Sequence, residues 1–170
     1  MRVQLYCDGG CRGNQERENV GGWGAYLIWG AHTRELFDGE ANTTNNKMEL
    51  TAVIEGLRAI NRDVPVDVFV DSAYVYNGIT EWITGWISKG WKNAKKEPVA
   101  NKDLWLELLA QKDRFSDIEF HKVKGHSDDE GNNHADLLAN KAMDRVEAEL
   151  AKQASASVKH EVLPEQDPPF

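Results

Sequence analysis

The chain has 170 residues, 41% of them hydrophobic, and a net charge of −8 with a pI near 5.1. This length and apolar content suit one globular domain with a substantial core, and the charge argues against a general affinity for polyanions. The sequence has no apolar run of roughly 18 residues, and its N-terminus enters a strand directly, so we expect neither a membrane span nor a signal peptide, and a cytoplasmic location.

The first predicted strand covers residues 2–8, where apolar and polar residues alternate before a glycine pair. It ends at Asp8, and open α/β sheets bind their ligands near the carboxyl ends of strands. Gly9, Gly10 and Gly13 follow and let a ligand approach the backbone closely.

Strands over 22–29 and 33–40 lead to a helix over 44–61, whose apolar residues repeat at helical spacing. Thr44 or Asn45 can cap this helix, and Glu49 lies within its first two turns. A solvated glutamate is the plain alternative there, because the helix dipole favours it by about 0.3–1 kcal/mol.

The strand over 66–71 ends at Asp71, which matches the placement of Asp8. An aspartate there can also serve as a helix N-cap. The next predicted elements, in chain order, are helices over 73–80, 82–88 and 101–112, a strand over 117–124 and a helix over 133–149.

The last helix carries Asp136 near its start, and the loop before it carries His126. An imidazole near a metal site could shuttle a proton or help product leave. Asp8, Glu49, Asp71 and Asp136 together indicate a divalent-metal site, because Mg²⁺ prefers a few carboxylates, several waters and substrate phosphate. Taken singly, each is an ordinary surface acid, since the chain has 28 acidic residues.

The ordered segments YCDGGCRGN, TTNNKMEL, VDSAYV and KGHSDDEGNNHAD resemble type 1 ribonuclease H, in its bacterial form above all. The resemblance covers residues 2–149. It includes ITEWITGWISKGWKNAKKEPVANKDLW, which is similar to the basic protrusion of that family.

The resemblance implies an endonuclease that cuts the RNA strand of RNA–DNA hybrids and leaves 5′-phosphate and 3′-hydroxyl ends, with two Mg²⁺ ions or with Mn²⁺. It assigns Asp8, Glu49, Asp71 and Asp136 as metal-binding catalytic carboxylates and His126 as an auxiliary residue. It also implies an α/β fold of the ribonuclease H type, with a five-stranded mixed sheet, its first three strands antiparallel, flanked by helices on both faces.

Selectivity for a hybrid requires contact with 2′-hydroxyls and with groove shape rather than with base edges. By resemblance, the RNA strand would meet six residues around the cut: Gly9, Gly10, Cys11, Asn14, Asn45 and Asn46. An amide suits a 2′-hydroxyl because both groups donate and accept hydrogen bonds. Thr44 would hold a phosphate of the DNA strand, a role compatible with helix capping.

The segment from residue 82 to residue 102 interleaves aromatic residues with lysines, a pattern that can stack on sugars or bases and neutralise phosphates. We expect Trp82 to lie mostly in the core. We expect Trp86 and Trp91 to face the DNA strand, with Lys89 and Lys92 beside them. The charge distribution permits this, because residues 128–170 hold 10 acidic and 4 basic residues and so carry most of the excess negative charge.

Two departures from the family pattern concern substrate preference rather than metal binding. The segment QERENV, residues 15–20, is longer and more charged than the family's short turn, and Ala73 stands where the bacterial pattern has a substrate-contacting glutamine. Cys7 and Cys11 lack zinc-site spacing and are expected as reduced thiols.

The expected catalytic domain covers residues 1–150, and residues 151–170 read as a disordered tail. The final DPPF resembles the C-terminus of bacterial single-stranded DNA-binding proteins, which makes a contact with replication or repair partners the alternative to an ordinary tail. We expect a monomer.

Two other functional classes remain to be weighed. The first is a hybrid-binding module without turnover, against which all four carboxylates argue. The second is an integrase or junction resolvase on the same fold, against which the first motif, the paired asparagines before Glu49 and the tryptophan-lysine segment argue.

Overall fold

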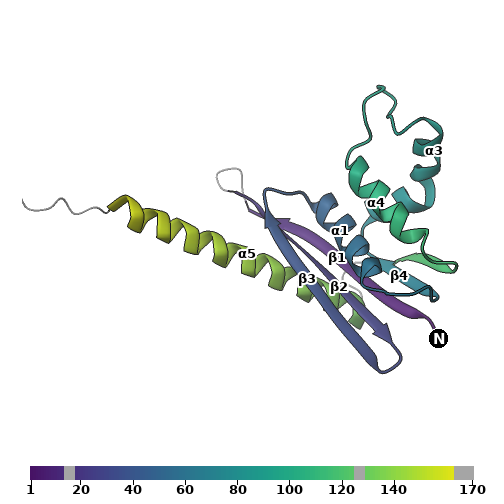
Figure 1. Ribbon diagram of the computed structural model, residues 1–170, viewed down its shortest axis with the longest axis horizontal. Coiled ribbons are helices and arrows are strands. Elements are labelled where there is room, and N and C mark those ends of the chain that lie inside the picture. The colour runs from purple at the N-terminus through teal and green to yellow at the C-terminus, as the bar shows by residue number, and fades with distance from the viewer. Residues whose placement is uncertain (14–17, 125–128, 163–170) are drawn as a thin grey trace, which may run out of the picture.

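Five strands form one mixed sheet in the computed structural model, which describes residues 1–13, 18–124 and 129–162, with side chains through residue 155 (Figure 1). The strands are β1 (Val3–Arg12), β2 (Val20–Trp29), β3 (His32–Ala41), β4 (Val66–Val70) and β5 (Ile118–Lys122). Their order is β3-β2-β1-β4-β5. The first three run antiparallel, whereas β4 and β5 run parallel to β1.

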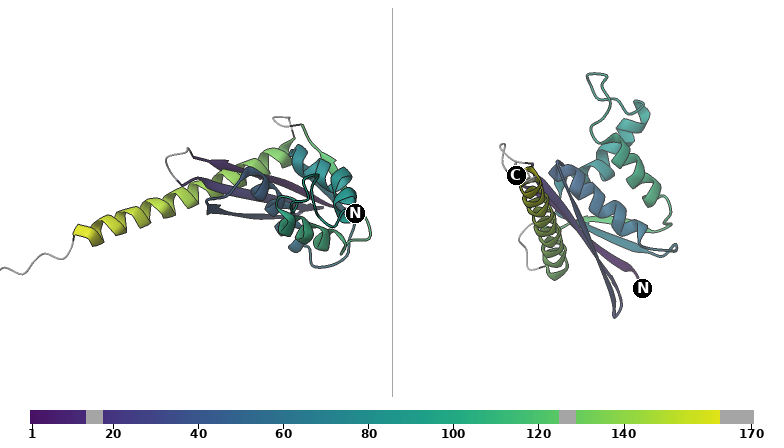
Figure 2. Two further views of the ribbon diagram at one scale, coloured as in Figure 1. Left: turned by 90° about the horizontal axis from the view of Figure 1, so that it is seen from above. Right: turned by 60° about the vertical axis from the view of Figure 1, so that its left-hand side comes forward.

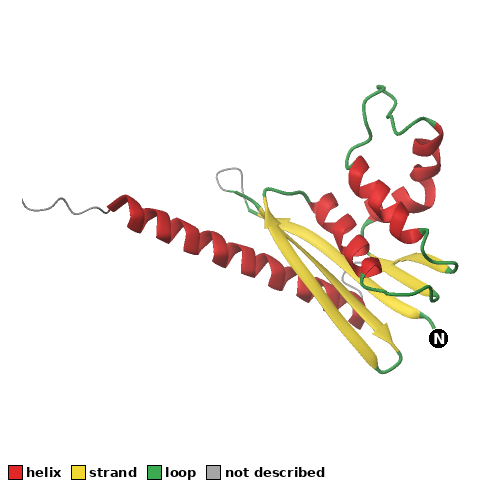
Figure 3. Ribbon diagram, viewed as in Figure 1, coloured by secondary structure: helices red, strands yellow, loops and turns green. Residues whose placement is uncertain are grey.

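Helices cover both faces of this sheet (Figure 3). They are α1 (Asn45–Arg58), α2 (Ala73–Asn77), a π-helical turn η1 (Gly78–Trp82), α3 (Ile83–Ser88), α4 (Lys102–Lys112) and α5 (Glu130–Val162). The predicted α/β fold with a five-stranded mixed sheet flanked by helices is therefore confirmed.

Side chains along the strands point alternately to the two faces of the sheet, and different helices cover the two faces. On one face, apolar residues of β1 and β4, such as Leu5 and Val68, are fully buried in the core that α1 and α4 complete. On the other face α5 crosses β2, where a Cβ at Gly24 would lie 2.5 Å from the carbonyl oxygen of Ala135. Figure 2 shows the long helix alone on that side of the sheet.

The first strand is longer than predicted and extends to Arg12, so Asp8 lies within β1 and not at its end. Asp8 is paired with Gly24, and the two glycines that follow are also paired with β2. The reason is that β2 begins at Val20 and its own glycines permit a ladder that continues past Asp8.

The last helix was predicted to end near residue 149, and this was wrong, since α5 continues to Val162 (Figure 1). Residues 150–162 contain no glycine or proline and include several alanines, so nothing in them breaks a helix. α5 therefore includes residues 151–162, where the sequence predicted a disordered tail, whereas residues 163–170 lie outside the described part. The division of the chain at residue 150 stays a prediction.

Among the described residues, none of the helices combines the length and the apolar composition that a membrane crossing requires. Both cysteines are free; Cys7 is buried, as expected of a core residue, and Cys11 is partly exposed.

Candidate active site

Glu49 approaches the first strand because Gly9 has no side chain. A Cβ added to Gly9 would lie 2.5 Å from the backbone nitrogen of Glu49 and 2.7 Å from the carbonyl oxygen of Met48. The first turns of α1 therefore rest directly on β1, one residue beyond Asp8. We expected the missing side chain at Gly9 to let a ligand approach the backbone; in the structure it lets α1 approach β1.

Asp8 is the most perturbed carboxyl group of the site. It is only 9% exposed. The pKa of Asp8 is raised to about 9, chiefly by burial and then by the neighbouring carboxylates of Asp136 and Asp71. A hydrogen bond from the backbone amide of Gly9 lowers this pKa slightly. The protonated form of this group is therefore favoured to a higher pH than in an ordinary aspartate.

Asp71 and Glu49 face the same cluster from the next strand and from α1. Burial raises the pKa of Asp71, although Lys122 at the end of β5 opposes the shift. Burial also raises the pKa of Glu49, partly offset by a hydrogen bond from the Ser72 hydroxyl. Ser72 in addition caps α2 by accepting the amide of Val75 at 3.1 Å. One hydroxyl thus links the helix start after Asp71 to the Glu49 carboxylate.

Asp136 reaches the cluster from α5 and remains exposed on its outer side. The start of α5 is fixed by Gly131, where a Cβ would lie 2.4 Å from the ring of Tyr6 on β1. The structure therefore brings Asp8, Glu49, Asp71 and Asp136 together from four different elements. His126, the fifth residue of the predicted site, lies outside the described residues.

The donor set fits a hard divalent cation. All four groups offer carboxylate oxygens, and their mutual repulsion and burial already raise the pKa of three of them. A bound cation would lower those pKa values and remove the repulsion. Binding of a cation to such a group would therefore be accompanied by release of a proton.

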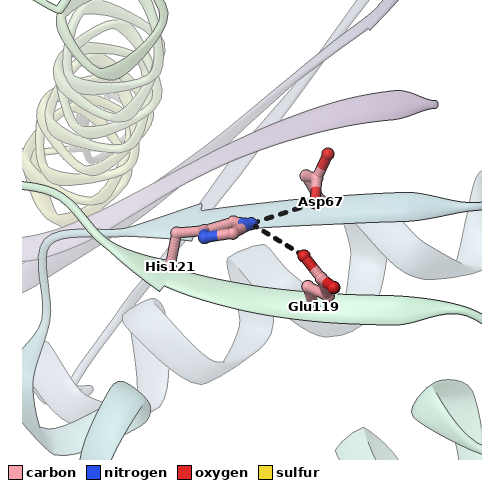
Figure 4. A group of neighbouring side chains, drawn as sticks. All are labelled: Asp67, Glu119 and His121. Atoms are coloured by element: carbon pink, nitrogen blue, oxygen red, sulfur yellow. Dashed lines mark hydrogen bonds and ion pairs between the residues drawn. The ribbon is translucent and has the colours of Figure 1, made fainter.

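A second group with metal-ligand chemistry lies on the neighbouring strands β4 and β5. One ligand atom each of Asp67, Glu119 and His121 falls within 4.8 Å of the others (Figure 4). The Asp67 carboxylate is already paired, however, with Arg2 Nε at 2.8 Å and with His121 Nε2 at 2.9 Å. The Arg2 hydrogen bond lowers the pKa of Asp67, and a cation here would have to compete with the guanidinium.

The predicted substrate contacts near the carboxylates lie on β1 and at the start of α1. Thr44 is the N-cap of α1 and accepts the amide of Lys47 at 3.2 Å. The side chain of Asn45 lies close to Gly10, since a Cβ there would be 4.0 Å from its Oδ1. Asn46 follows on the same turn, and Cys11 continues β1. Asn14 lies outside the described residues.

Trp82 was predicted to lie mostly in the core, and this is wrong, since it is 40% exposed. The buried stripe of this helical segment runs through Val75, Ile79 and Ile83, and the π-helical turn η1 leaves Trp82 beside it. Trp82 contacts the rings of Tyr74 and Trp86. Simple helical spacing could not have revealed the extra residue in this turn.

Trp86 and Trp91 are partly buried and pack against the core and each other, with ring centroids 5.9 Å apart. Only part of each ring is therefore exposed and available to contact a DNA strand. The lysines expected beside them, Lys89 and Lys92, are exposed.

Two residues with clear roles at this site were missed in the sequence. Ser72 was given no role in the site, although its position directly after Asp71 places its hydroxyl near the cluster. Asn19, at the end of QERENV, hydrogen-bonds across to Thr43 just before the α1 cap. No sequence signal links two residues 24 positions apart.

Comparison with known proteins identifies the family of the chain. A family model of RNase H matches residues 1–144. The chain is 54% identical over 155 residues to Ribonuclease H of Chromohalobacter salexigens, covering 91% of this chain and 92% of that protein. It is 51% identical over 145 residues to Ribonuclease H of Chromobacterium violaceum, covering 85% and 97%.

Similar solved structures include LC9-RNase H1, a type 1 RNase H with the type 2 active-site motif, at a TM-score of 0.75 and 32% identity over 83% of this chain and 71% of that one. LC11-RNase H1, solved in complex with an RNA/DNA hybrid, has a TM-score of 0.63 and 25% identity over 85% and 98%. Ribonucleases H of this family use divalent metal ions. The chain therefore belongs to the ribonuclease H family, as a type 1 enzyme of the bacterial kind.

Proposed function

We propose that this ribonuclease hydrolyses the RNA strand of RNA–DNA hybrids with two Mg²⁺ ions, leaving 5′-phosphate and 3′-hydroxyl ends. The observation that carries the proposal is that Asp8, Glu49, Asp71 and Asp136 gather in one partly buried cluster, in which burial raises the pKa of the first three. The hybrid bound to LC11-RNase H1 supports the choice of substrate. Mn²⁺ can replace Mg²⁺ in this proposal, since both accept oxygen ligands.

The four carboxylates would coordinate the two ions unequally. Asp8 and Asp71 would hold both ions, whereas Glu49 and Asp136 would hold one each. When bound, such ions lower the pKa of an attacking water and stabilise the leaving oxygen. Ser72 keeps the Glu49 carboxylate oriented through its hydroxyl. By resemblance to the family, His126 would act as an auxiliary proton carrier. Its loss should therefore slow turnover without abolishing it.

Substrate recognition would come from the residues around the cluster. Asn45 and Asn46, with Gly9, Gly10, Cys11 and Asn14, would contact the RNA strand, and Thr44 would hold a DNA phosphate. The exposed Lys89 and Lys92 would neutralise phosphates of the DNA strand, with Trp86 and Trp91 beside them. The enzyme would act as a cytoplasmic monomer, and DPPF would contact single-stranded DNA-binding replication or repair proteins.

The deciding experiment presents one end-labelled sequence as RNA–DNA hybrid, single-stranded RNA, RNA duplex and DNA duplex. Each is incubated with Mg²⁺ and with EDTA, beside an Asp8→Asn control. We expect metal-dependent cleavage of the hybrid's RNA strand alone, lost in the control. Hybrid binding without cleavage would instead indicate a silent binding module, and cleavage of duplex DNA would indicate a different nuclease activity on this fold.

A further inference from the structure

Asn19 continues the β2–β3 ladder beyond its last strand pair. That pair joins Val20 to Ala41. The next rung is a backbone hydrogen bond from the amide of Asn42 to the carbonyl of Asn19, at 2.9 Å. The side chain of Asn19 then adds one more rung: its Oδ1 accepts the amide of Thr43 at 2.9 Å, and its Nδ2 donates to the carbonyl of Thr43 at 2.7 Å.

The side-chain amide of Asn19 therefore pairs with Thr43 much as a backbone peptide would. An amide is suited to this because it presents one acceptor and one donor in a fixed plane. Aspartate would offer no donor to the Thr43 carbonyl, and alanine would offer neither group. The fit is specific to asparagine at this position.

Thr43 is held in place mainly by this pairing and by packing. The residue is 5% exposed, and its methyl group rests on β2, where a Cβ at Gly21 would lie 2.2 Å from it. Its own hydroxyl has no hydrogen-bond partner among the residues that the structure describes. The backbone of Thr43 thus depends on Asn19 for both of its polar groups, which is costly to lose in a buried segment.

The segment held in this way leads directly into the proposed substrate contacts. Thr44 is the next residue and caps α1, and Asn45 and Asn46 form its first turn. Glu49, in contrast, is fixed separately, because its backbone rests on Gly9 and its carboxylate is bonded by Ser72. A change at Asn19 should therefore disturb the substrate contacts more than the metal ligands.

We propose that Asn19 is a positioning residue that fixes Thr44, Asn45 and Asn46 for the substrate through its paired hydrogen bonds to Thr43. The inference rests on the proposed function, since it assigns a task to the same site. It also gives a role to the last part of QERENV, the segment that departs from the family pattern.

The test compares wild type, Asn19→Ala and Asn19→Asp in cleavage of the hybrid under steady-state conditions. Asn19→Ala should raise KM about five- to tenfold with kcat changed less than about twofold, because binding contacts rather than metal ligands are disturbed. Asn19→Asp should also raise KM, since a carboxylate faces the Thr43 carbonyl. Asp63→Ala is the matched control: Asp63 likewise bonds a distant segment twice, through the amide and hydroxyl of Ser116 at 3.0 and 2.5 Å, but far from α1's start.

Amide hydrogen exchange on the free protein supplies a readout that does not depend on cleavage. The Thr43 amide should exchange faster in Asn19→Ala, and should remain protected in Asn19→Asp, which keeps the acceptor. An unchanged KM in both Asn19 variants, or an equal rise of KM in Asp63→Ala, would overturn the inference. Absence of hybrid cleavage by the wild type would refute the proposed function instead, and unchanged exchange at Thr43 would still refute the pairing.

Discussion

A Cβ at Gly9 would lie 2.5 Å from the backbone nitrogen of Glu49, so the glycine beside Asp8 sets how closely α1 can approach β1. Asp8 and Glu49 are 41 residues apart in the chain, and their elements can approach because residue 9 has no side chain. This close approach explains why the cluster can form between a strand and the first turns of a helix.

Gly9→Ala should therefore damage both stability and activity. The new methyl group meets backbone atoms that cannot rotate away, so α1 must shift, at a cost of about 1–3 kcal/mol. The shift moves Glu49, and hybrid cleavage should fall by at least about tenfold. Thermal unfolding and initial rates measure the two effects.

Gly10→Ala provides the matched control for stability, because its Cβ would approach no described atom closer than 4.0 Å. An equal fall in melting temperature for both variants would contradict the steric explanation. Activity in the control reports separately on the proposed RNA contact at Gly10.

Asp8→Asn should stabilise the metal-free enzyme while abolishing cleavage. The pKa of Asp8 is about 9 in the folded protein, against 3.8 for an ordinary aspartate, so the folded state binds a proton that the unfolded state has released between these values. Stability contributed by this group is present below about pH 4 and is lost as the pH rises toward 9. Asparagine resembles the protonated acid and avoids this loss.

Thermal unfolding in EDTA between pH 4 and pH 8 measures this difference. The melting temperature of Asp8→Asn should exceed that of wild type at pH 8 by about 2–4 °C or more, which corresponds to about 1 kcal/mol, and the two should converge at pH 4. A difference independent of pH would contradict a raised pKa. Mg²⁺ should raise the melting temperature of wild type more than that of the variant.

Asp67→Asn and Asp71→Asn should have different effects, because Asp67 lies within β4 and Asp71 directly follows it. Asp71 belongs to the buried cluster, so its replacement should nearly abolish cleavage. Asp67 pairs with Arg2 and His121 on a different part of the sheet, so its replacement should leave the rate and its Mg²⁺ dependence within about twofold of wild type. Rates measured across a Mg²⁺ titration decide this, and a shifted Mg²⁺ midpoint in Asp67→Asn would show that the second group contributes.

Trp82→Ala and Trp105→Ala should have opposite consequences. Trp105 is fully buried and donates its indole N–H to the hydroxyl of Tyr74 at 3.0 Å, so its loss should cost about 3–5 kcal/mol of stability. Trp82 is exposed, so its loss should leave stability nearly unchanged and weaken hybrid binding by about 1–3 kcal/mol if its ring stacks on the substrate. Unfolding and hybrid-binding measurements distinguish these outcomes, and unchanged binding in Trp82→Ala would leave the stacking to Trp86 and Trp91.

Much of the fold followed from the sequence, because alternation of apolar and polar residues reports directly on which face of an element is buried. The strands around Leu5 and Val68 and the helix that carries Glu49 were predicted within a few residues. The sequence also pointed to the four carboxylates, since each stands near the start or end of a predicted element and together they match one family's ordered motifs; their role as metal ligands stays a prediction.

Other features depended on contacts that local periodicity does not contain. The ladder that continues past Asp8, the π-helical turn that exposes Trp82 and the pairing of Asn19 with Thr43 arise from neighbours distant in the chain. The sequence alone determined the elements and the chemistry of the cluster. Only the tertiary structure decided how the carboxylates meet and which of their pKa values are raised, because close approach and desolvation depend on the packing of elements against one another.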